Sequence, residues 1–133
     1  FHFTKAIKLD PNFTLAHNNL GNALSDAGKT EEAISHYKLA IKLKPGYAAA
    51  HNNLGIALSN SRKIDEAISH YKMAIKFKPN FAQSHYNLGL DLLTAVKVQE
   101  AISHFKIAIN LKPDFALARN NLKIALNISE GEK

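Results

Sequence analysis

Seven histidines are the first residues whose type could support chemistry, because imidazole nitrogens are common ligands of zinc. They fall into two series with a spacing of 34 residues: His17, His51 and His85, and His2, His36, His70 and His104. In a helical repeat, equivalent side chains lie roughly one helix-packing distance, on the order of 10 Å, apart. Zinc ligands converge at about 2 Å from the ion. We therefore expect no metal site and interpret the histidines as packing and surface residues.

Motifs for catalysis are missing from the sequence. The chain has no cysteine, no G-x-S-x-G motif and no glycine-rich phosphate loop. Glu31, Glu32, Asp65, Glu66 and Glu100 open predicted helices, where carboxylates interact favourably with the helix dipole. We expect a protein that is not an enzyme and that needs no cofactor.

The formal net charge of +6 raises the question of an anionic partner. The lysines recur in the second half of each 34-residue period, at Lys38, Lys42, Lys44, Lys72, Lys76, Lys78, Lys106 and Lys112. Aromatic residues that would stack on the bases of a single strand do not alternate with them. This pattern indicates a solvated outer face and argues against nucleic-acid binding.

Asparagine recurs at one position of the period, at Asn19, Asn53, Asn87 and Asn121. It is a mediocre helix former, so its repetition inside predicted helices needs a reason. The side-chain amide offers both donors and an acceptor and can pair with the backbone of an extended peptide. Recent duplication, which also copies residues that are not used, is the alternative explanation.

The elements that position these residues follow from the same period, marked by Pro11, Pro45, Pro79 and Pro113. Apolar residues recur at helical spacing in two segments of each period, and proline follows the second segment, where it blocks continuation of a helix. The pattern predicts helices over 14–27, 30–43, 48–61, 64–77, 82–95, 98–111 and 116–129, with a partial helix over 1–9. Helices joined by such short links pack antiparallel.

Glycine in the middle of the first helix indicates close helix packing, with an equally small alanine as its partner in the second helix. The glycines are Gly21, Gly55 and Gly89, and the alanines are Ala33, Ala67 and Ala101. With Tyr37, Tyr71 and Phe105 in the second helix and the proline after it, the chain resembles a tetratricopeptide repeat protein along its whole length. The resemblance implies an all-α, right-handed solenoid of antiparallel helix pairs whose concave face binds peptides.

One departure from the family is that histidine, and then Arg119, replaces the large aromatic residue expected early in the first helix. We expect the imidazoles to fill the same wedge between helices, with their polar edge reaching water.

The repeat frame divides the chain into a partial preceding repeat and three full repeats. These span 1–13, 14–47, 48–81 and 82–115, and a capping helix with a charged tail covers 116–133. Lys123 replaces the glycine in this last helix, which is tolerable where no second helix packs against it. At the other end, Phe3, Ile7 and Leu9 present an apolar edge, so self-association through that edge is one alternative function.

In the family, first-helix residues line the concave groove. The positions that correspond here are Asn18, Asn19, Asn22, Asn52, Asn53, Ile56, Tyr86, Asn87, Leu90, Asn120 and Asn121. They resemble the asparagine ladder of O-linked N-acetylglucosamine transferases, with Tyr86, Ile56 and Leu90 as apolar contacts. The resemblance implies a scaffold module that binds an extended peptide. A second alternative is the non-catalytic, substrate-recruiting part of a longer glycosyltransferase.

Other members of the family bind the acidic C-terminal tail of heat-shock chaperones through lysines and arginines in the groove. The matching positions hold Asn18, Asn22, Asn53, Gln83 and Asn87, so the cations are absent. A terminal carboxylate would lose water there without gaining a countercharge. The sequence also shows no signal peptide and no apolar run long enough to span a membrane, so we expect a cytoplasmic protein.

Overall fold

The computed structural model describes residues 12–131, where every regular element is an α-helix. The helices are α2 (Asn12–Asp26), α3 (Thr30–Leu43), α4 (Ala48–Asn60), α5 (Ile64–Phe77), α6 (Ala82–Thr94), α7 (Val98–Leu111) and α8 (Ala116–Gly131). Each end lies within two residues of its predicted position. The helix predicted over 1–9 and the apolar edge at Phe3, Ile7 and Leu9 lie outside the described residues. In 12–131, no helix combines the length and the apolar character that crossing a membrane requires.

The turn inside each repeat has the same backbone geometry three times. The second residue after the first helix adopts a positive φ, which is 79° at Gly28, 66° at Arg62 and 62° at Val96. The next N–H then bonds a carbonyl five residues back, as from Lys63 to Leu58 at 2.9 Å. This pairing is the Schellman motif, which satisfies free carbonyls at the helix end. The chain reverses direction there, so the two helices of a repeat pack antiparallel.

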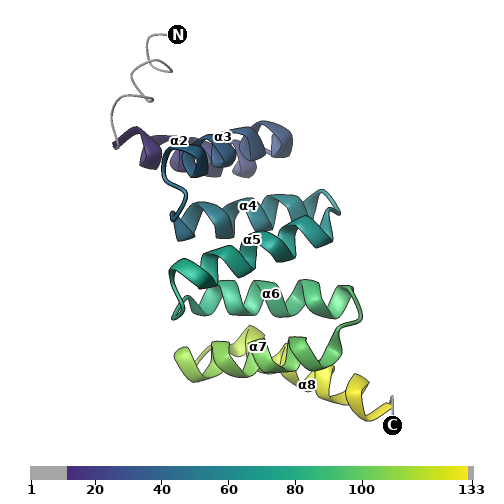
Figure 1. Cartoon of the computed structure of the whole chain (residues 1–133). Helices are drawn as coiled ribbons and strands as arrows, with labels where there is room; N and C mark the ends of the chain where they lie inside the picture. The colour runs from purple at the N-terminus through teal and green to yellow at the C-terminus, as the bar shows by residue number, and fades with distance from the viewer. Residues whose placement is uncertain (1–11, 132–133) are drawn as a thin grey trace.

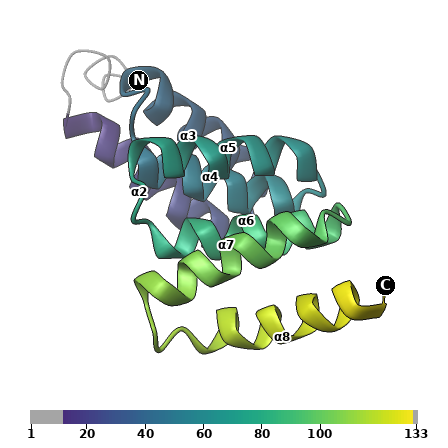
Figure 2. The same ribbon diagram turned by 60° about the horizontal axis from the view of Figure 1, so that its bottom comes forward.

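Helix pairs stack into an all-α solenoid, as predicted (Figure 1). Within a repeat, α2 contacts α3, α4 contacts α5 and α6 contacts α7. Each second helix also packs on the first helix of the next repeat, and neighbouring first helices touch. Figure 2 shows α8 lying along one side of α7 at the end of the stack. The first helices therefore form one continuous layer, which is where the predicted site residues lie.

The hydrophobic core consists of the same set of buried residues in each repeat, and it has no single centre. Each second helix buries two alanines, an isoleucine and an aromatic ring, which are Ala33, Ile34, Tyr37 and Ala40 in α3 and their equivalents in α5 and α7. First helices contribute leucines such as Leu54, Leu58, Leu88 and Leu92, all at most 1% exposed. The last helix, α8, buries only Ala118 and Ala125. Each repeat is thus stabilised by its neighbours.

Close packing explains the mid-helix glycines, although the partner differs from the prediction. A Cβ atom on Gly55 would lie 2.5 Å from Cε1 of Tyr71, and Gly21 and Gly89 face Tyr37 and Phe105 in the same way. The nearest side-chain atoms are thus those of the aromatic ring, not those of the alanine that we expected. Only glycine leaves room for the ring.

Candidate functional site on the concave face

The two histidine series meet in pairs, one pair in each repeat. His17 lies 3.0 Å from His36, His51 lies 3.1 Å from His70, and His85 lies 3.0 Å from His104, measured between the Nδ1 atoms. The spacing within each series does not reveal this pairing, because it joins the two helices of one repeat. In 12–131, no three or more His, Cys, Asp or Glu side chains are grouped so that they could hold a metal ion.

The proton positions in a pair follow from a second hydrogen bond. Nε2 of His51 lies 2.8 Å from the carbonyl oxygen of Pro45, and His85 makes the same bond to Pro79 at 3.0 Å. A carbonyl only accepts, so Nε2 of His51 carries the hydrogen. In the neutral ring Nδ1 is then the acceptor for the N–H of His70. The expectation that the polar edge reaches water is wrong, because His51 is only 3% exposed and bonded on both sides.

Burial in these pairs affects protonation. The pKa of His17 is lowered by burial and by the neighbouring His36. The pKa of His70 is lowered by burial first, and then by His51 and Lys38. The nearby Glu66 acts in the opposite direction and raises it. The pKa of His104 is lowered by burial first and by His85 second. Lys72 lowers this pKa further, whereas Glu100 raises it. Each pair therefore contains one imidazole that resists protonation in the folded protein.

The recurring asparagines connect neighbouring repeats. Asn53 donates from Nδ2 to Oδ1 of Asn18 at 3.1 Å, and Asn87 donates to Oδ1 of Asn52 at 3.2 Å. Asn121 donates to the Tyr86 hydroxyl at 3.2 Å and to the carbonyl of Leu117 at 2.9 Å. Each donor thus contacts the residue 35 positions earlier, on the preceding first helix. A structural role for these amides is sufficient to explain part of their repetition.

Burial divides the predicted contact residues into two groups. Asn18, Asn52 and Tyr86 are buried between neighbouring first helices, so little of each side chain is open to a ligand. Asn87 is nearly as buried, at 8% exposure. The residues that remain open or half-buried are Asn19, Asn22, Asn53, Ile56, Leu90, Asn120 and Asn121.

A groove of about 420 Å³ on α2 and α4 collects three of the open residues. It is lined by Asn22, Ser25, Asp26, Tyr37, Asn53 and Ile56. The Tyr37 hydroxyl donates to Oδ1 of Asn22 at 2.6 Å, which fixes that amide. Burial first, and Asp26 second, raise the pKa of Tyr37, so this hydroxyl stays protonated and remains a donor at neutral pH. The groove thus brings two amides, an apolar side chain and the Asp26 carboxylate to one space.

Family models identify the repeat. One described as TPR repeat matches residues 21–61, and two described as tetratricopeptide repeat match 2–35 and 48–81. The chain is a tetratricopeptide repeat protein. A sequence comparison with curated proteins gives no match.

Solved structures of other tetratricopeptide repeats share the fold. The first such repeat domain of Spaghetti (RPAP3), bound to the HSP90 peptide SRMEEVD, has a TM-score of 0.89 and 21% identity, covering 91% of this chain and 96% of that one. MamA has a TM-score of 0.87 and 27% identity, covering 96% and 75%. The Thermobaculum terrenum O-GlcNAc transferase mutant K341M has a TM-score of 0.80 and 23% identity, covering 85% of this chain and 22% of that one.

Asp91 is a buried polar residue of the first-helix layer that the predicted site does not include. Its position in the tetratricopeptide repeat holds alanine elsewhere, at Ala23, Ala57 and Ala125. Oδ1 accepts a hydrogen bond from the Ser59 hydroxyl at 2.9 Å, whereas the buried Oδ2 has no partner among the described residues. Burial raises the pKa of this carboxyl, and the Ser59 bond opposes the change. The break in the alanine series was the signal that could have identified it.

Proposed function

We propose that this tetratricopeptide repeat protein is a non-catalytic interaction module that binds an extended peptide segment along its concave face. The observation that carries the proposal is the groove between α2 and α4. It places the ladder residue Asn53 beside Asn22 and Ile56, so amide and apolar groups face the same space. The structure of the Spaghetti repeat domain, which holds an HSP90 peptide, supports peptide binding as a use of this fold.

The hydrogen bonds between repeats determine which groups the ladder can offer. Asn53 and Asn121 donate through Nδ2, and their Oδ1 atoms accept no hydrogen bond from any residue in 12–131. Oδ1 of Asn87 accepts from Gln83, whose exposed side chain can turn away. The ladder therefore presents oxygen acceptors, which match the N–H groups of a peptide backbone. Recognition of this kind does not depend on the peptide's side chains.

The spacing of the ladder sets the register of the peptide. Neighbouring first helices lie about 8–10 Å apart, and an extended chain rises about 3.3 Å per residue. One asparagine can therefore bind roughly every third residue of the peptide. Ile56 and Leu90 stand at the same position in successive repeats and extend an apolar contact beside the ladder. Ile124 continues the series on α8 and is exposed.

Chaperone tails are poor candidates for the peptide. The positions that would clamp a terminal carboxylate hold Asn18, Asn22, Asn53, Gln83 and Asn87, and none of these side chains carries a positive charge. Asn18 and Asn87 are also buried. A carboxylate placed there would be desolvated without a countercharge. We propose a neutral, backbone-directed mode of binding instead.

The test uses peptides selected on the wild-type protein from a random display library, with Kd measured by fluorescence anisotropy. Replacing Asn19, Asn53 and Asn121 by alanine should weaken binding about tenfold or more, since each lost hydrogen bond contributes about 0.5–1.5 kcal/mol. Asn80→Ala, at an exposed position in the turn between α5 and α6, is the matched control and should leave Kd unchanged. Circular dichroism verifies that helicity is retained in both. Equal affinities for the ladder variant and the control would refute the proposal.

A further inference from the structure

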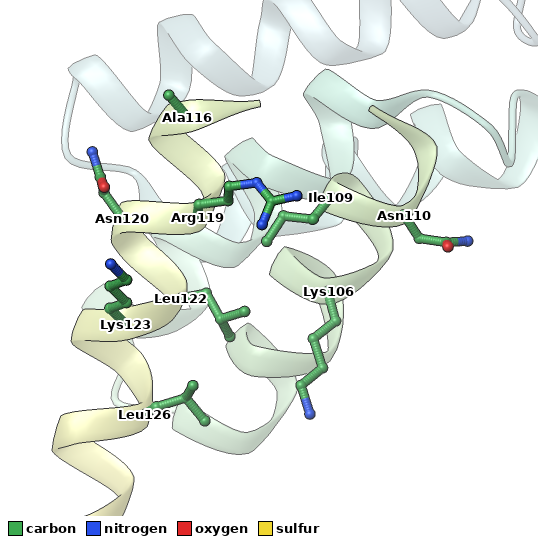
Figure 3. Close-up of a pocket in the computed structure, with 9 residues that line it drawn as sticks. All are labelled: Lys106, Ile109, Asn110, Ala116, Arg119, Asn120, Leu122, Lys123 and Leu126. Carbon is green, nitrogen blue, oxygen red and sulfur yellow. The ribbon is translucent and has the colours of Figure 1, made fainter. Parts of the chain in front are cut away.

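The groove between α7 and α8 is a second surface, at the end of the stack, with a volume of about 570 Å³. Its apolar lining comes from Ile109, Leu122 and Leu126, and its charged lining from Lys106, Arg119 and Lys123. Figure 3 shows Arg119, Leu122 and Leu126 extending from α8 toward α7. No carboxylate is among the residues that line it.

The α8 side of this groove corresponds to buried core positions in the earlier repeats. Leu126 is 41% exposed, whereas its equivalents Leu58 and Leu92 are 1% and 0% exposed. In those repeats the first helix is covered by the second helix of the same repeat, as α5 covers α4. Within the described residues, no helix covers α8 in this way. The groove is therefore a packing surface without an occupant in this part of the chain.

A second helix like α5 or α7 does not fit this surface. Lys123 stands where Gly55 and Gly89 stand, and even a Cβ atom at those glycines would lie 2.5–2.6 Å from an aromatic ring of the second helix. The array's own second helices always carry that ring, as Tyr37, Tyr71 or Phe105. The occupant must therefore lack an aromatic residue opposite Lys123.

Arg119 changes the chemistry of the surface at a second point. It replaces the histidine of the earlier repeats and keeps the bond to the proline carbonyl, with Nε 2.8 Å from the oxygen of Pro113. In the earlier repeats Nδ1 of the histidine contacts a histidine of the second helix, whereas Arg119 offers the remaining N–H donors of a guanidinium. Those donors match a carboxylate, which arginine can bind with two parallel hydrogen bonds.

We propose that this groove docks an amphipathic helix of another protein, with aliphatic side chains on one face and Asp or Glu beside it. The aliphatic face covers Ile109, Leu122 and Leu126, and the carboxylates pair with Lys106, Arg119 and Lys123. The cationic lining complements these carboxylates, and Lys123 excludes the array's own type of second helix. None of the ladder asparagines Asn19, Asn53, Asn87 and Asn121 lines this groove, although the neighbouring Asn120 does.

The test uses a fluorescein-labelled helical peptide with leucine on one face and glutamate on the other, and a lysine version of the same peptide. Fluorescence anisotropy should show binding of the glutamate peptide only, weakened by added salt. The variant Lys106→Glu/Lys123→Glu should weaken binding about tenfold, through the loss and reversal of two surface charge pairs. The matched control Lys38→Glu/Lys72→Glu changes the equivalents of Lys106 in earlier repeats and should alter Kd less than about twofold.

Amide chemical shifts on titration should move in α7 and α8 and stay constant in α2 and α4. Equal binding of the lysine peptide, equal weakening in both variants, or shifts confined to the concave face would overturn the proposal. Light scattering tests the remaining occupant, a second copy of this chain. A mass that rises with concentration in the wild type but not in Lys106→Glu/Lys123→Glu would assign the groove to self-association and would also overturn it.

Discussion

The histidine pairs predict that this protein loses stability as the pH falls from 7.5 to 5.5. His17, His70 and His104 have lowered pKa values in the folded state, so below the unfolded value of about 6.5 the unfolded chain binds more protons. Stability therefore decreases with decreasing pH throughout that range. The loss ends where the folded imidazoles also become protonated.

The size of the effect follows from the number of pairs. One pH unit below its unfolded pKa, a histidine that stays neutral in the folded state costs about 1.4 kcal/mol, so three such groups give a ceiling of about 4 kcal/mol. His70 and His104 are partly exposed to solvent, and screening reduces the total to about 2 kcal/mol. For a chain of 133 residues this corresponds to a decrease in Tm of roughly 6–8 °C.

The assay is thermal unfolding followed by circular dichroism at constant ionic strength. The comparison variant replaces His36, His70 and His104 by asparagine, whose amide can still bond the partner imidazole but does not titrate. We expect the decrease in Tm to shrink by about half or more, with His17, whose pKa is lowered mainly by burial, leaving a remainder. The same decrease in wild type and variant, or a Tm that rises toward pH 5.5, would refute this reasoning.

Three further changes test the packing. Val96→Gly should raise the free energy of unfolding by about 1 kcal/mol in urea titrations, because Val96 is 75% exposed and held at φ 62°, where Gly28 stands in the first repeat. Gly55→Ala should lower it by about 1–2 kcal/mol, since the clash with Tyr71 exceeds the gain in helix propensity, whereas Gly131→Ala, with open space around it, should be neutral. Asp91→Asn should stabilise the protein by about 1 kcal/mol at pH 7. That gain should shrink at lower pH, because the raised pKa lets the wild-type carboxyl take up a proton.

Helix positions were predictable because one period repeats proline, glycine and aromatic residues in register. The same frame placed the asparagine series in the first-helix layer, where the structure has it. It could not reveal which side chains lie between repeats, since Asn18 and Asn19 are adjacent in sequence yet one is buried and the other exposed. Asn18 accepts a hydrogen bond from Asn53 of the next repeat, and the period does not encode this contact between helices.

The histidine pairs could not be predicted from the sequence for a related reason. His51 and His70 are separated by 19 residues and belong to different helices, so no spacing along one helix connects them. What brings them together is the tight antiparallel pairing that the Schellman turn and Gly55 permit. A comparison of positions across the two helices of one repeat, rather than between repeats, was needed to find the contact.

Repetition alone does not distinguish a ligand-binding residue from a structural one in this chain. Asn53, Asn87 and Asn121 each bond the preceding repeat, so packing is a sufficient reason for an amide donor at this position. Packing gives no reason for a free acceptor at this position. Asn53 lines a groove, and its Oδ1 accepts no hydrogen bond from any described residue. A serine or a threonine could supply a donor there as well, but only an amide supplies a donor to one side and a strong carbonyl acceptor to the other. The double use of this side chain is therefore the property that favours peptide binding on the concave face.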